Sequence, residues 1–286
     1  MSSEHGLGYQ ETRRSGAGSG NGGPRARRDA RLQSCVEHCY RLHLASIVRP
    51  SIRFEIKYRI RPHEADAIAR HIVRYMQADE YGEGGSARYP VHSLYLDSPG
   101  LRLYRAKAEG AFSRFKLRAR CYNFQPARSF FLEVKARKGE AMTKSRGLAT
   151  LEETRTLLSG AGADRYDPAL ANFCRERDNL RARPAAWITY DRAAYVGGER
   201  SLVRVTFDSD IKVGLPTDDL SEPKQWYGLP EVKGLVVLEI KYTGSYPAWV
   251  AQTIRRFDLF RSSMSKYRQG IDVLLERDLL PMNRAV

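Results

Sequence analysis

The stretch Arg114–Arg120, with the sequence RFKLRAR, places the strongest constraint on how this chain can fold. Cations alternate with apolar residues over seven positions, and every polar residue is positive. Successive side chains of a β-strand point to opposite faces, so the stretch predicts a strand with cations on one face and apolar groups on the other. Same-face neighbours about 7 Å apart repel by about half a kcal/mol in water, and by more in a desolvated groove. The strand therefore needs an anion to offset its charge.

The same alternation recurs along four further segments, RFEIKYRI, FLEVKAR, VRVTFD and LEIK, and the spacing Glu-x-Lys appears three times among them. One interpretation is an ordinary antiparallel sheet with its charged face in water. The other is a barrel whose charged faces point inward and whose apolar faces pack against helices outside. Buried cations must be paired, and the few carboxylates in these strands cannot neutralise so many Arg and Lys residues. Phosphate chains fit such an interior best, because Arg binds phosphate oxygens in a bidentate manner. Carboxylates left over could hold a divalent cation.

The charge of the whole chain also indicates an anionic ligand. Its formal net charge is +15, which indicates an anionic partner: nucleic acid, a phosphate-rich ligand or an acidic membrane surface. The charged strands show no aromatic platform on which bases could stack, which argues against specific nucleic-acid recognition.

Composition divides the chain into a predicted disordered basic tail over residues 1–34, rich in Gly, Ser and Arg, and a folded domain over residues 35–286. Many sequential strands with a few helices predict an α+β fold, an antiparallel β-barrel with helices packed outside. Scattered cysteines, no apolar run long enough to span a membrane and no signal peptide favour a cytoplasmic location. The cluster Cys35, His38, Cys39 and His43 has a spacing that zinc sites seldom use, so a helix at the start of the domain is favoured there.

Nine motifs occur in an order that resembles the VTC domain, the polyphosphate polymerase domain of the vacuolar transporter chaperone complex, within the triphosphate tunnel metalloenzyme (CYTH-like) superfamily. The similarity covers about residues 50 to 275. The motifs are RFEIKYRI, YLDSPGLRLY, FKLRARCYN, FFLEVKAR, MTKSRG, ITYDRAAY, VRVTFDSDI, LEIKY and MSKYRQGI.

This resemblance implies a tunnel that binds a nucleoside triphosphate and a divalent metal, Mn²⁺ or Mg²⁺. The implied catalytic residues, which hold the phosphates in line, are Arg118, Arg120, Lys135 and Arg204. The implied phosphate-binding residues are Lys57, Lys144, Arg192 and Lys266. The implied metal ligand is Glu239, and Glu55 and Glu133 are either further ligands or ion-pair partners of neighbouring cations.

Two departures from the family pattern affect the expected activity. Hydrolytic members of the superfamily open with Glu-x-Glu-x-Lys, whereas Arg53 stands here in place of the first Glu. This difference favours binding of long polyphosphate over two-metal hydrolysis. The phosphate-sensing domain and membrane helices of the fungal complex are not found in the sequence, so we expect a stand-alone catalytic domain or one that works with a separate membrane-protein partner.

Three functions follow as hypotheses. The first is transfer of the ATP γ-phosphoryl group to a growing polyphosphate chain, which needs positioning and charge neutralisation rather than a nucleophilic side chain. The second is a metal-dependent tripolyphosphatase or nucleoside triphosphatase, with water as acceptor. The third is a non-catalytic polyanion-binding module.

Overall fold

The computed structural model describes residues 53–79, 87–139, 141–161, 167–197 and 203–280. The predicted tail and the Cys35–His43 cluster lie outside the described residues. The strands are β1 (Arg53–Ile60), β2 (Met76–Ala78), β3 (Arg88–Asp97), β4 (Ser113–Cys121), β5 (Ser129–Lys138), β6 (Ala141–Thr150), β7 (Arg183–Gly197), β8 (Arg204–Gly214), β9 (Tyr227–Gly228) and β10 (Val236–Thr243). The helices are α2 (Pro62–Ile72), α3 (Arg102–Ala108), α4 (Leu151–Leu158), α5 (Pro168–Leu180), η3 (Pro230–Val232), α6 (Ala248–Arg256) and α7 (Lys266–Glu276).

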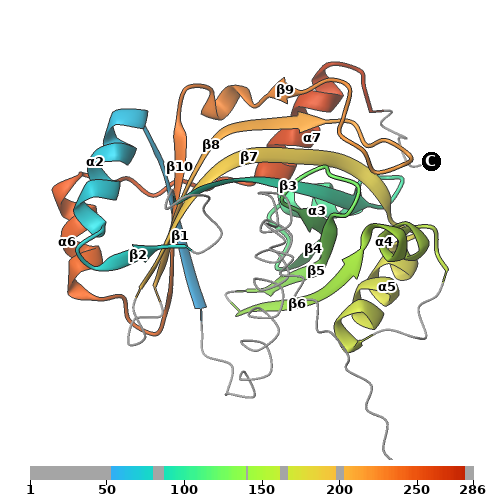
Figure 1. Ribbon diagram of the computed structural model, residues 1–286, viewed down its shortest axis with the longest axis horizontal. Coiled ribbons are helices and arrows are strands. Elements are labelled where there is room, and N and C mark those ends of the chain that lie inside the picture. Colours follow the sequence, from blue (N-terminus) through green and yellow to red (C-terminus); the bar gives the residue numbers. More distant parts are fainter. Residues whose placement is uncertain (1–52, 80–86, 140, 162–166, 198–202, 281–286) are drawn as a thin grey trace, which may run out of the picture. The chain divides into compact units, whose positions relative to one another are not determined.

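The strands form one antiparallel sheet in the order β1-β10-β8-β7-β3-β4-β5-β6, with β2 added to β7 and β9 to β8 (Figure 1). This sheet with its helices confirms the predicted α+β class. The closed barrel is not confirmed, because no backbone pairing joins β1 to β6 within the described residues. The sheet curls instead: Glu55 on β1 lies 2.9 Å from Lys135 on β5, although the two strands are far apart in the sheet order.

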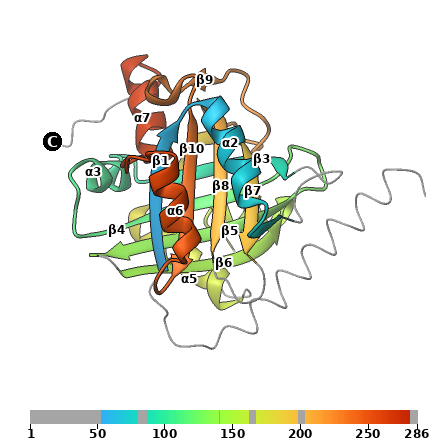
Figure 2. The same cartoon turned by 90° about the vertical axis from the view of Figure 1, so that its left-hand side faces the viewer.

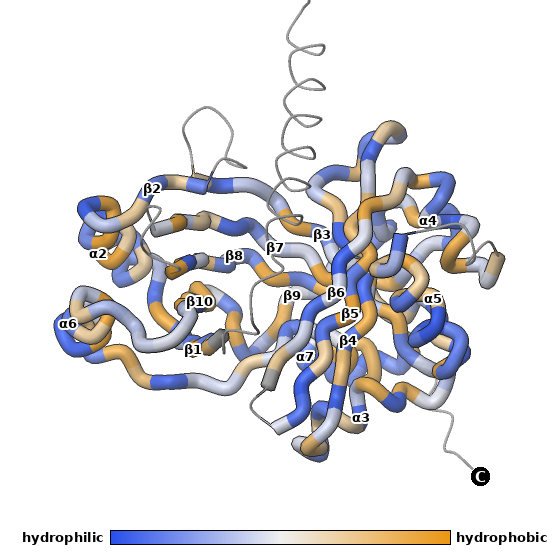
Figure 3. The backbone as a smooth tube through the Cα atoms, turned by 90° about the horizontal axis from the view of Figure 1, so that it is seen from below, coloured by the Kyte–Doolittle hydropathy of each residue, from blue (hydrophilic) through white to orange (hydrophobic). Residues whose placement is uncertain are grey.

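Strand register divides the sheet into two chemically different faces. On β4, Arg118 lies opposite Tyr95 of β3 and Glu133 of β5, while Leu117 lies opposite Leu96 and Val134. Side chains of directly opposite residues share a face, so the alternation in each sequence gathers the charged residues on one face of the sheet and leaves the other face apolar. Figure 3 shows this alternation of hydrophilic and hydrophobic residues along β4, β5 and β6.

Helices cover the apolar face in two groups. Helices α4 and α5 pack on β4, β5 and β6 through a cluster that includes Leu157, Phe173 and Leu132, each fully buried. Helices α2 and α6 lie side by side over β1, β10 and β8, where Ile68 and Val250 join the apolar residues of those strands (Figures 1 and 2). Burial of this apolar area is what holds the charged face in a fixed arrangement.

Helix α7 packs instead on the charged side of the sheet. Ile188 on β7 lies opposite Ser93, which in turn lies opposite Arg120, so Ile188 shares the face of that cation. Gly270 of α7 contacts this position closely: a β-carbon there would lie 2.5 Å from Ile188 Cδ1 and 3.1 Å from Val213 Cγ2. The close approach brings the first residues of α7 to the charged face.

We expect Gly270→Ala to destabilise the protein by about 1–3 kcal/mol, because the added methyl group overpacks the contact between α7 and the sheet. Urea unfolding would measure the change. Gly228→Ala is the matched control, since a β-carbon at Gly228 would meet no atom within 4 Å. Equal stability of the two variants would show that the close packing of α7 is not required.

Local predictions were confirmed for most strands and corrected in two places. The sequence after Pro62 places Ala65, Ile68, Ile72 and Met76 at helical spacing, which predicts a helix that runs from Pro62 past Met76. This prediction was wrong at its end: α2 ends at Ile72, and Met76–Ala78 forms β2, because pairing with β7 overrides the helical spacing. Helix α3 was not predicted; the carboxylate of Asp97 accepts hydrogen bonds from the backbone N–H groups of Leu103 and Tyr104 at its start. Within the described part of the chain, no helix has the length and apolar character needed to cross a membrane.

Candidate functional site

The charged face gathers every residue that the sequence suggested for the site. We call it the cationic face. Its cations on the sheet are Lys57, Arg114, Lys116, Arg118, Arg120, Lys135, Arg137, Lys144, Arg146, Arg192, Arg204 and Lys241, and α7 adds Lys266. Its carboxylates are Glu55, Glu133, Asp208 and Glu239.

Glu239 on β10 lies at the centre of a cluster of lysines. Its carboxylate oxygens lie 3.1 Å from Lys57 Nζ, 3.0 Å from Lys241 Nζ and 3.6 Å from Lys266 Nζ. Burial on its own would raise the pKa of Glu239, but these cations outweigh burial and hold the pKa well below its usual range. Glu239 is therefore ionised.

Glu55 on β1 shares the same lysines. It lies 3.0 Å from Lys57 Nζ and 2.9 Å from Lys135 Nζ, and Lys241 Nζ is 3.9 Å away. Burial opposes its ionisation, but the positive charges of Lys241, Lys57 and Lys135 lower its pKa below the ordinary value. Glu55 thus joins the end strand β1 to β5, the strand next to the opposite end of the curled sheet, through side chains.

Glu133 on β5 is fully buried and holds three cations. Its oxygens lie 2.6 Å from Arg118 NH2, 2.7 Å from Lys144 Nζ and 3.0 Å from Arg146 Nε. Burial and the neighbouring Arg146 lower the pKa of Lys144 to about 7, although Glu133 opposes this shift. In this arrangement Glu133 is an ion-pair partner of the phosphate-binding candidates.

Asp208 on β8 organises a third cluster. Arg192 binds it in a bidentate manner at 2.7 and 2.8 Å, and Lys266 Nζ lies 2.6 Å from it. The ring of Tyr190 lies beneath both cations, 5.2 Å from the Arg192 guanidinium carbon and 4.7 Å from Lys266 Nζ. Arg192 and Lys266, distant in sequence, are thereby fixed side by side.

Arg204 stands at one side of the cationic face, about one third exposed. Its guanidinium lies 2.5 Å from Asp79 and donates to the Tyr89 hydroxyl at 3.1 Å. In the strand register, Arg204 on β8 lies directly opposite Lys241 on β10. Arg204 therefore lies on the cationic face, with partners that differ from those of the other cations.

No carboxylate of the described residues lies within ion-pair distance of Arg120 or Lys116. Arg120 is 8% exposed and donates to the Ser93 hydroxyl at 3.2 Å and the Tyr190 hydroxyl at 3.4 Å. Lys116 Nζ contacts the Ser265 hydroxyl at 3.0 Å, and burial lowers its pKa to about 8. A buried cation without a directly paired carboxylate is costly, and a bound anion would lower that cost.

Tyr95 lies among these cations and stacks on Tyr267 of α7, with ring centroids 4.7 Å apart. Its hydroxyl receives a hydrogen bond from Arg118 at 3.1 Å. Burial would raise its pKa, but Arg118 and Lys116 outweigh burial and bring the pKa to about 7. Tyr95 can therefore supply part of the missing negative charge when no ligand is bound.

The carboxylates of the face differ in how well they suit a divalent metal. Among the described residues, no group of three or more His, Cys, Asp or Glu side chains is placed to enclose an ion. Mg²⁺, however, commonly takes only one or two protein carboxylates, and phosphate oxygens and waters complete its coordination. Glu239 and Glu55 are ionised and share Lys57. The residues thus fit a metal ion shared with bound phosphate, not a site closed by protein alone.

The sequence argument missed several residues of the face as members of the site: Tyr95, Ser93, Tyr190, Arg146, Lys241, Asp208 and Ser265. Arg146 and Lys241 could have been found, since each lies two residues from a predicted site residue and so on the same face. The tyrosines and serines carry no charge, and only the register and the position of α7 bring them to the cations.

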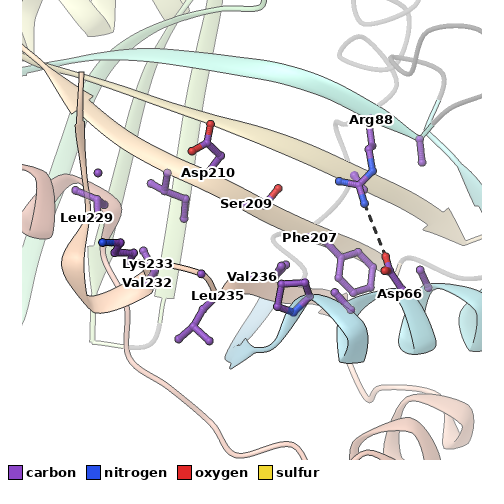
Figure 4. A pocket seen from close by; sticks show the side chains of 18 of the residues that line it. Asp66, Arg88, Phe207, Ser209, Asp210, Leu229, Val232, Lys233, Leu235 and Val236 are labelled. Atoms are coloured by element: carbon purple, nitrogen blue, oxygen red, sulfur yellow. Dashed lines mark ion pairs between the residues drawn. The ribbon is translucent and has the colours of Figure 1, made fainter. Parts of the chain in front are cut away.

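A cavity of about 970 Å³ lies on the opposite side of the sheet, between α2 and the segment 228–236. Figure 4 shows its lining, with Phe207 of β8 and the ion pair between Arg88 and Asp66, which is 3.9 Å long. None of the predicted site residues lines it. The candidate site is therefore the cationic face and not this cavity.

Comparison with known proteins identifies the family. A model of the VTC domain matches residues 52–275, so the chain belongs to the VTC domain family. No curated protein matches the sequence. Among solved structures, the chain is similar to the PH1819 protein from Pyrococcus horikoshii OT3, with 13% identity, a TM-score of 0.40 and coverage of 78% of this chain and 99% of that one. It is also similar to a structure described as "a putative adenylate cyclase" from Bacillus halodurans, with 13% identity, a TM-score of 0.43 and coverage of 75% and 94%.

Proposed function

We propose that this VTC-domain protein is a phosphotransferase that moves the γ-phosphoryl group of ATP onto the end of an inorganic polyphosphate chain. The observation that carries the proposal is the unneutralised charge at Arg120 and Lys116, next to Arg118, on a face where most of the other cations are already paired. A ligand for this face must carry several negative charges in a row, and phosphate chains do so. Membership of the VTC domain family supports the same substrate class.

In this proposal the curled sheet forms a triphosphate tunnel, with the contact between Glu55 and Lys135 bringing the edge strand β1 to β5. Arg118, Arg120, Lys135 and Arg204 hold the transferring phosphates in line. Positioning of this kind, together with charge neutralisation, is the main contribution a protein makes to phosphoryl transfer.

The remaining candidates would bind phosphates next to the reacting group: Lys57, Lys144, Arg192 and Lys266. Lys57 and Lys266 also hold Glu239. When Mn²⁺ or Mg²⁺ is bound by Glu239, with Glu55 as the second carboxylate, it would offset charge that develops on the phosphate oxygens. Glu133 keeps Arg118, Lys144 and Arg146 in position rather than holding the metal.

The experiment is incubation of the full chain with ATP and either Mn²⁺ or Mg²⁺. Products are resolved by gel for polyphosphate, and ADP and free phosphate are assayed in parallel. Chains accompanied by an equivalent amount of ADP are the expected result. Free phosphate without chains would overturn the polymerase proposal in favour of a triphosphatase. Neither product, with tight binding of polyphosphate retained, would indicate a non-catalytic binding module.

The pKa of Lys116 predicts a pH dependence of ligand affinity. Its pKa in the folded protein is lowered from 10.5 to about 8, so Lys116 loses its charge as the pH rises through this value. We expect Lys116→Met to weaken tripolyphosphate binding most at pH 7, with the difference from the unmodified protein shrinking as the pH approaches about 9.5. Calorimetric titration at several pH values measures both proteins with the same ligand, which cancels titration of the phosphate itself.

As the pH rises, the contribution of Lys116 to ligand affinity should fall, whereas the free energy of unfolding of the ligand-free protein should increase. The unfolded chain keeps the Lys116 proton to a higher pH than the folded protein does, so this residue makes folding more favourable as the pH rises from about 8 towards 10.5.

The affinity measurement also has an outcome that would contradict the prediction. If the ratio between the tripolyphosphate affinities of the unmodified protein and Lys116→Met stayed constant across the pH range, Lys116 would not belong to the anion site.

A further inference from the structure

A cluster of four aromatic rings lies where α2 and α6 run side by side, on the side of the sheet away from the cationic face (Figure 2). The ring of Tyr75 stacks on that of Trp249, with centroids 5.0 Å apart. The ring of His71 contacts Tyr75 and Phe257 edge-on, at centroid distances of 6.1 and 5.7 Å. We call these four residues the aromatic patch. They belong to neither the cationic face nor the cavity beside α2.

The aromatic patch is open to solvent. Among the described residues four large apolar side chains are exposed, and two of them lie here: Tyr75 is 38% exposed and its neighbour Val73 is 55% exposed. Trp249 and Phe257 are half-buried, because each also packs on the apolar cluster that holds α2 and α6 to the sheet. Neighbouring exposed apolar side chains with polar residues around them are characteristic of interaction surfaces.

Two exposed arginines lie beside these rings. The guanidinium carbon of Arg74 lies 5.9 Å from the centroid of the Tyr75 ring, and that of Arg256 lies 5.9 Å from the centroid of the Phe257 ring. Within the part of the chain that the structure describes, no carboxylate lies within ion-pair distance of either arginine. Burial and then the positive charges of Arg74 and Arg256 lower the pKa of His71, which agrees with both cations lying close to the patch. The surface therefore combines exposed aromatic rings with positive charge that no acid neutralises.

This combination fits the surface of an anionic membrane better than a nucleic acid. Aromatic side chains favour the boundary between lipid headgroups and acyl chains, and arginines favour anionic headgroups. Bases would need free ring faces on which to stack, whereas Tyr75 and Trp249 stack on each other and Arg74 lies over the Tyr75 ring. The branched apolar side chain of Val73 suits lipid and gives a base no stacking surface.

We propose that the aromatic patch, together with Val73, Arg74 and Arg256, is a docking surface for an anionic lipid membrane. Tyr75 and Trp249 enter the headgroup layer, and the two arginines bind the phosphates of the lipid headgroups. Helices α2 and α6 cover the apolar side of the sheet, so a docked molecule keeps the cationic face open to its own ligand. The proposal does not depend on the reaction proposed above.

The test is sedimentation of the full chain with vesicles of phosphatidylcholine, either alone or with about one third phosphatidylglycerol as the anionic lipid. We expect the unmodified protein to bind the anionic vesicles and not the neutral ones. Arg74→Gln/Arg256→Gln should weaken this binding about tenfold, and Val73→Ser/Tyr75→Ser should weaken it by a similar factor. Circular dichroism and thermal unfolding would confirm that the variants are folded.

Tryptophan fluorescence gives a second readout that charge attraction alone would not produce. Anionic vesicles with brominated acyl chains quench a tryptophan whose ring enters the lipid. We expect such quenching in the unmodified protein and its loss in Trp249→Phe, which keeps an aromatic ring at this position and should still bind the vesicles. Trp187 and Trp226 remain in that variant and lie on the other side of the molecule's core from the patch, in the cluster beneath α4 and α5.

Three controls match the variants of the patch. Arg175→Gln/Arg183→Gln removes the same charge at exposed positions elsewhere, and Phe112→Ser removes an aromatic side chain that is 69% exposed. Lys116→Met/Arg120→Gln removes two cations of the cationic face. All three should bind anionic vesicles as the unmodified protein does.

Several results would overturn the proposal. One is absence of binding to anionic vesicles, and another is an equal loss of binding in any of the three controls, because attraction would then act through another surface. Quenching that persists in Trp249→Phe would show that a different region enters the lipid. Binding of single-stranded RNA, or self-association without vesicles, that is lost in the patch variants while vesicle binding is retained would assign the patch to that partner instead.

Discussion

Arg120→Gln is expected to weaken tripolyphosphate binding by about tenfold to a hundredfold while leaving the stability of the free protein unchanged or slightly higher. Arg120 is a buried cation with no carboxylate within ion-pair distance among the described residues, and Glu133, which attracts it from further away, keeps its three direct ion pairs when Arg120 is replaced. The replacement also relieves repulsion from Arg118. In the complex, by contrast, it would donate charge-assisted hydrogen bonds to phosphate, each worth about 1.5–3 kcal/mol. Calorimetric titration and urea unfolding on the same samples measure the two effects.

Arg175→Gln is the matched control, since Arg175 is exposed on α5 and lies on the apolar side of the sheet. It should change neither affinity nor stability. If Arg120→Gln destabilised the protein and left tripolyphosphate binding intact, then Arg120 would be a structural residue held by Ser93 and Tyr190, and the anion site would have to lie elsewhere.

Glu133→Gln is expected to have the largest effect on stability, a loss of about 3–5 kcal/mol in the free energy of unfolding. Removing one partner of a buried ion pair leaves the other charges uncompensated, and here three cations depend on one fully buried carboxylate. The same change makes the cationic face more positive. Polyphosphate should therefore bind more tightly to the folded variant and raise its melting temperature more than that of the unmodified protein.

The control for this prediction is Glu152→Gln, where an exposed carboxylate pairs with Arg155 on the surface of α4. Such surface pairs contribute about 0–1 kcal/mol. The ligand measurement also separates the two roles considered for Glu133. Suppose instead that polyphosphate bound Glu133→Gln more weakly than it binds the unmodified protein, and that added metal no longer strengthened this binding. Glu133 would then be part of the metal site and not an ion-pair partner.

Arg120→Gln is expected to weaken ligand binding without loss of stability, whereas Glu133→Gln is expected to lower stability and strengthen binding. The two effects differ because the carboxylates and the unpaired cations of the face have different roles. Glu133, Asp208 and Glu239 act as internal counter-charges that let most of the cations be buried when no ligand is present. Arg120 and Lys116 keep an excess of positive charge for the ligand. A face neutralised throughout would be more stable and would bind phosphate less well.

The sequence by itself determined which residues share a face. Alternation along RFKLRAR and FLEVKAR requires only the two-residue period of a strand, and this period alone assigns the cations and the apolar residues of β4 and β5 to opposite sides. The α+β class and most strand positions followed from the same period. The order of the motifs was sufficient to indicate the VTC domain family.

Only the tertiary structure decided which charges meet. The contact between Glu55 and Lys135 depends on the curl of a sheet in which their strands are far apart, and Lys266 reaches Asp208 because Gly270 lets α7 approach β7 and β8 closely. The helix predicted through Met76 was wrong for the same reason, since pairing with β7 outweighed a local pattern. Local periodicity fixes the direction of a side chain relative to its own strand, whereas the neutralisation of a charge depends on groups brought near it by packing between distant segments.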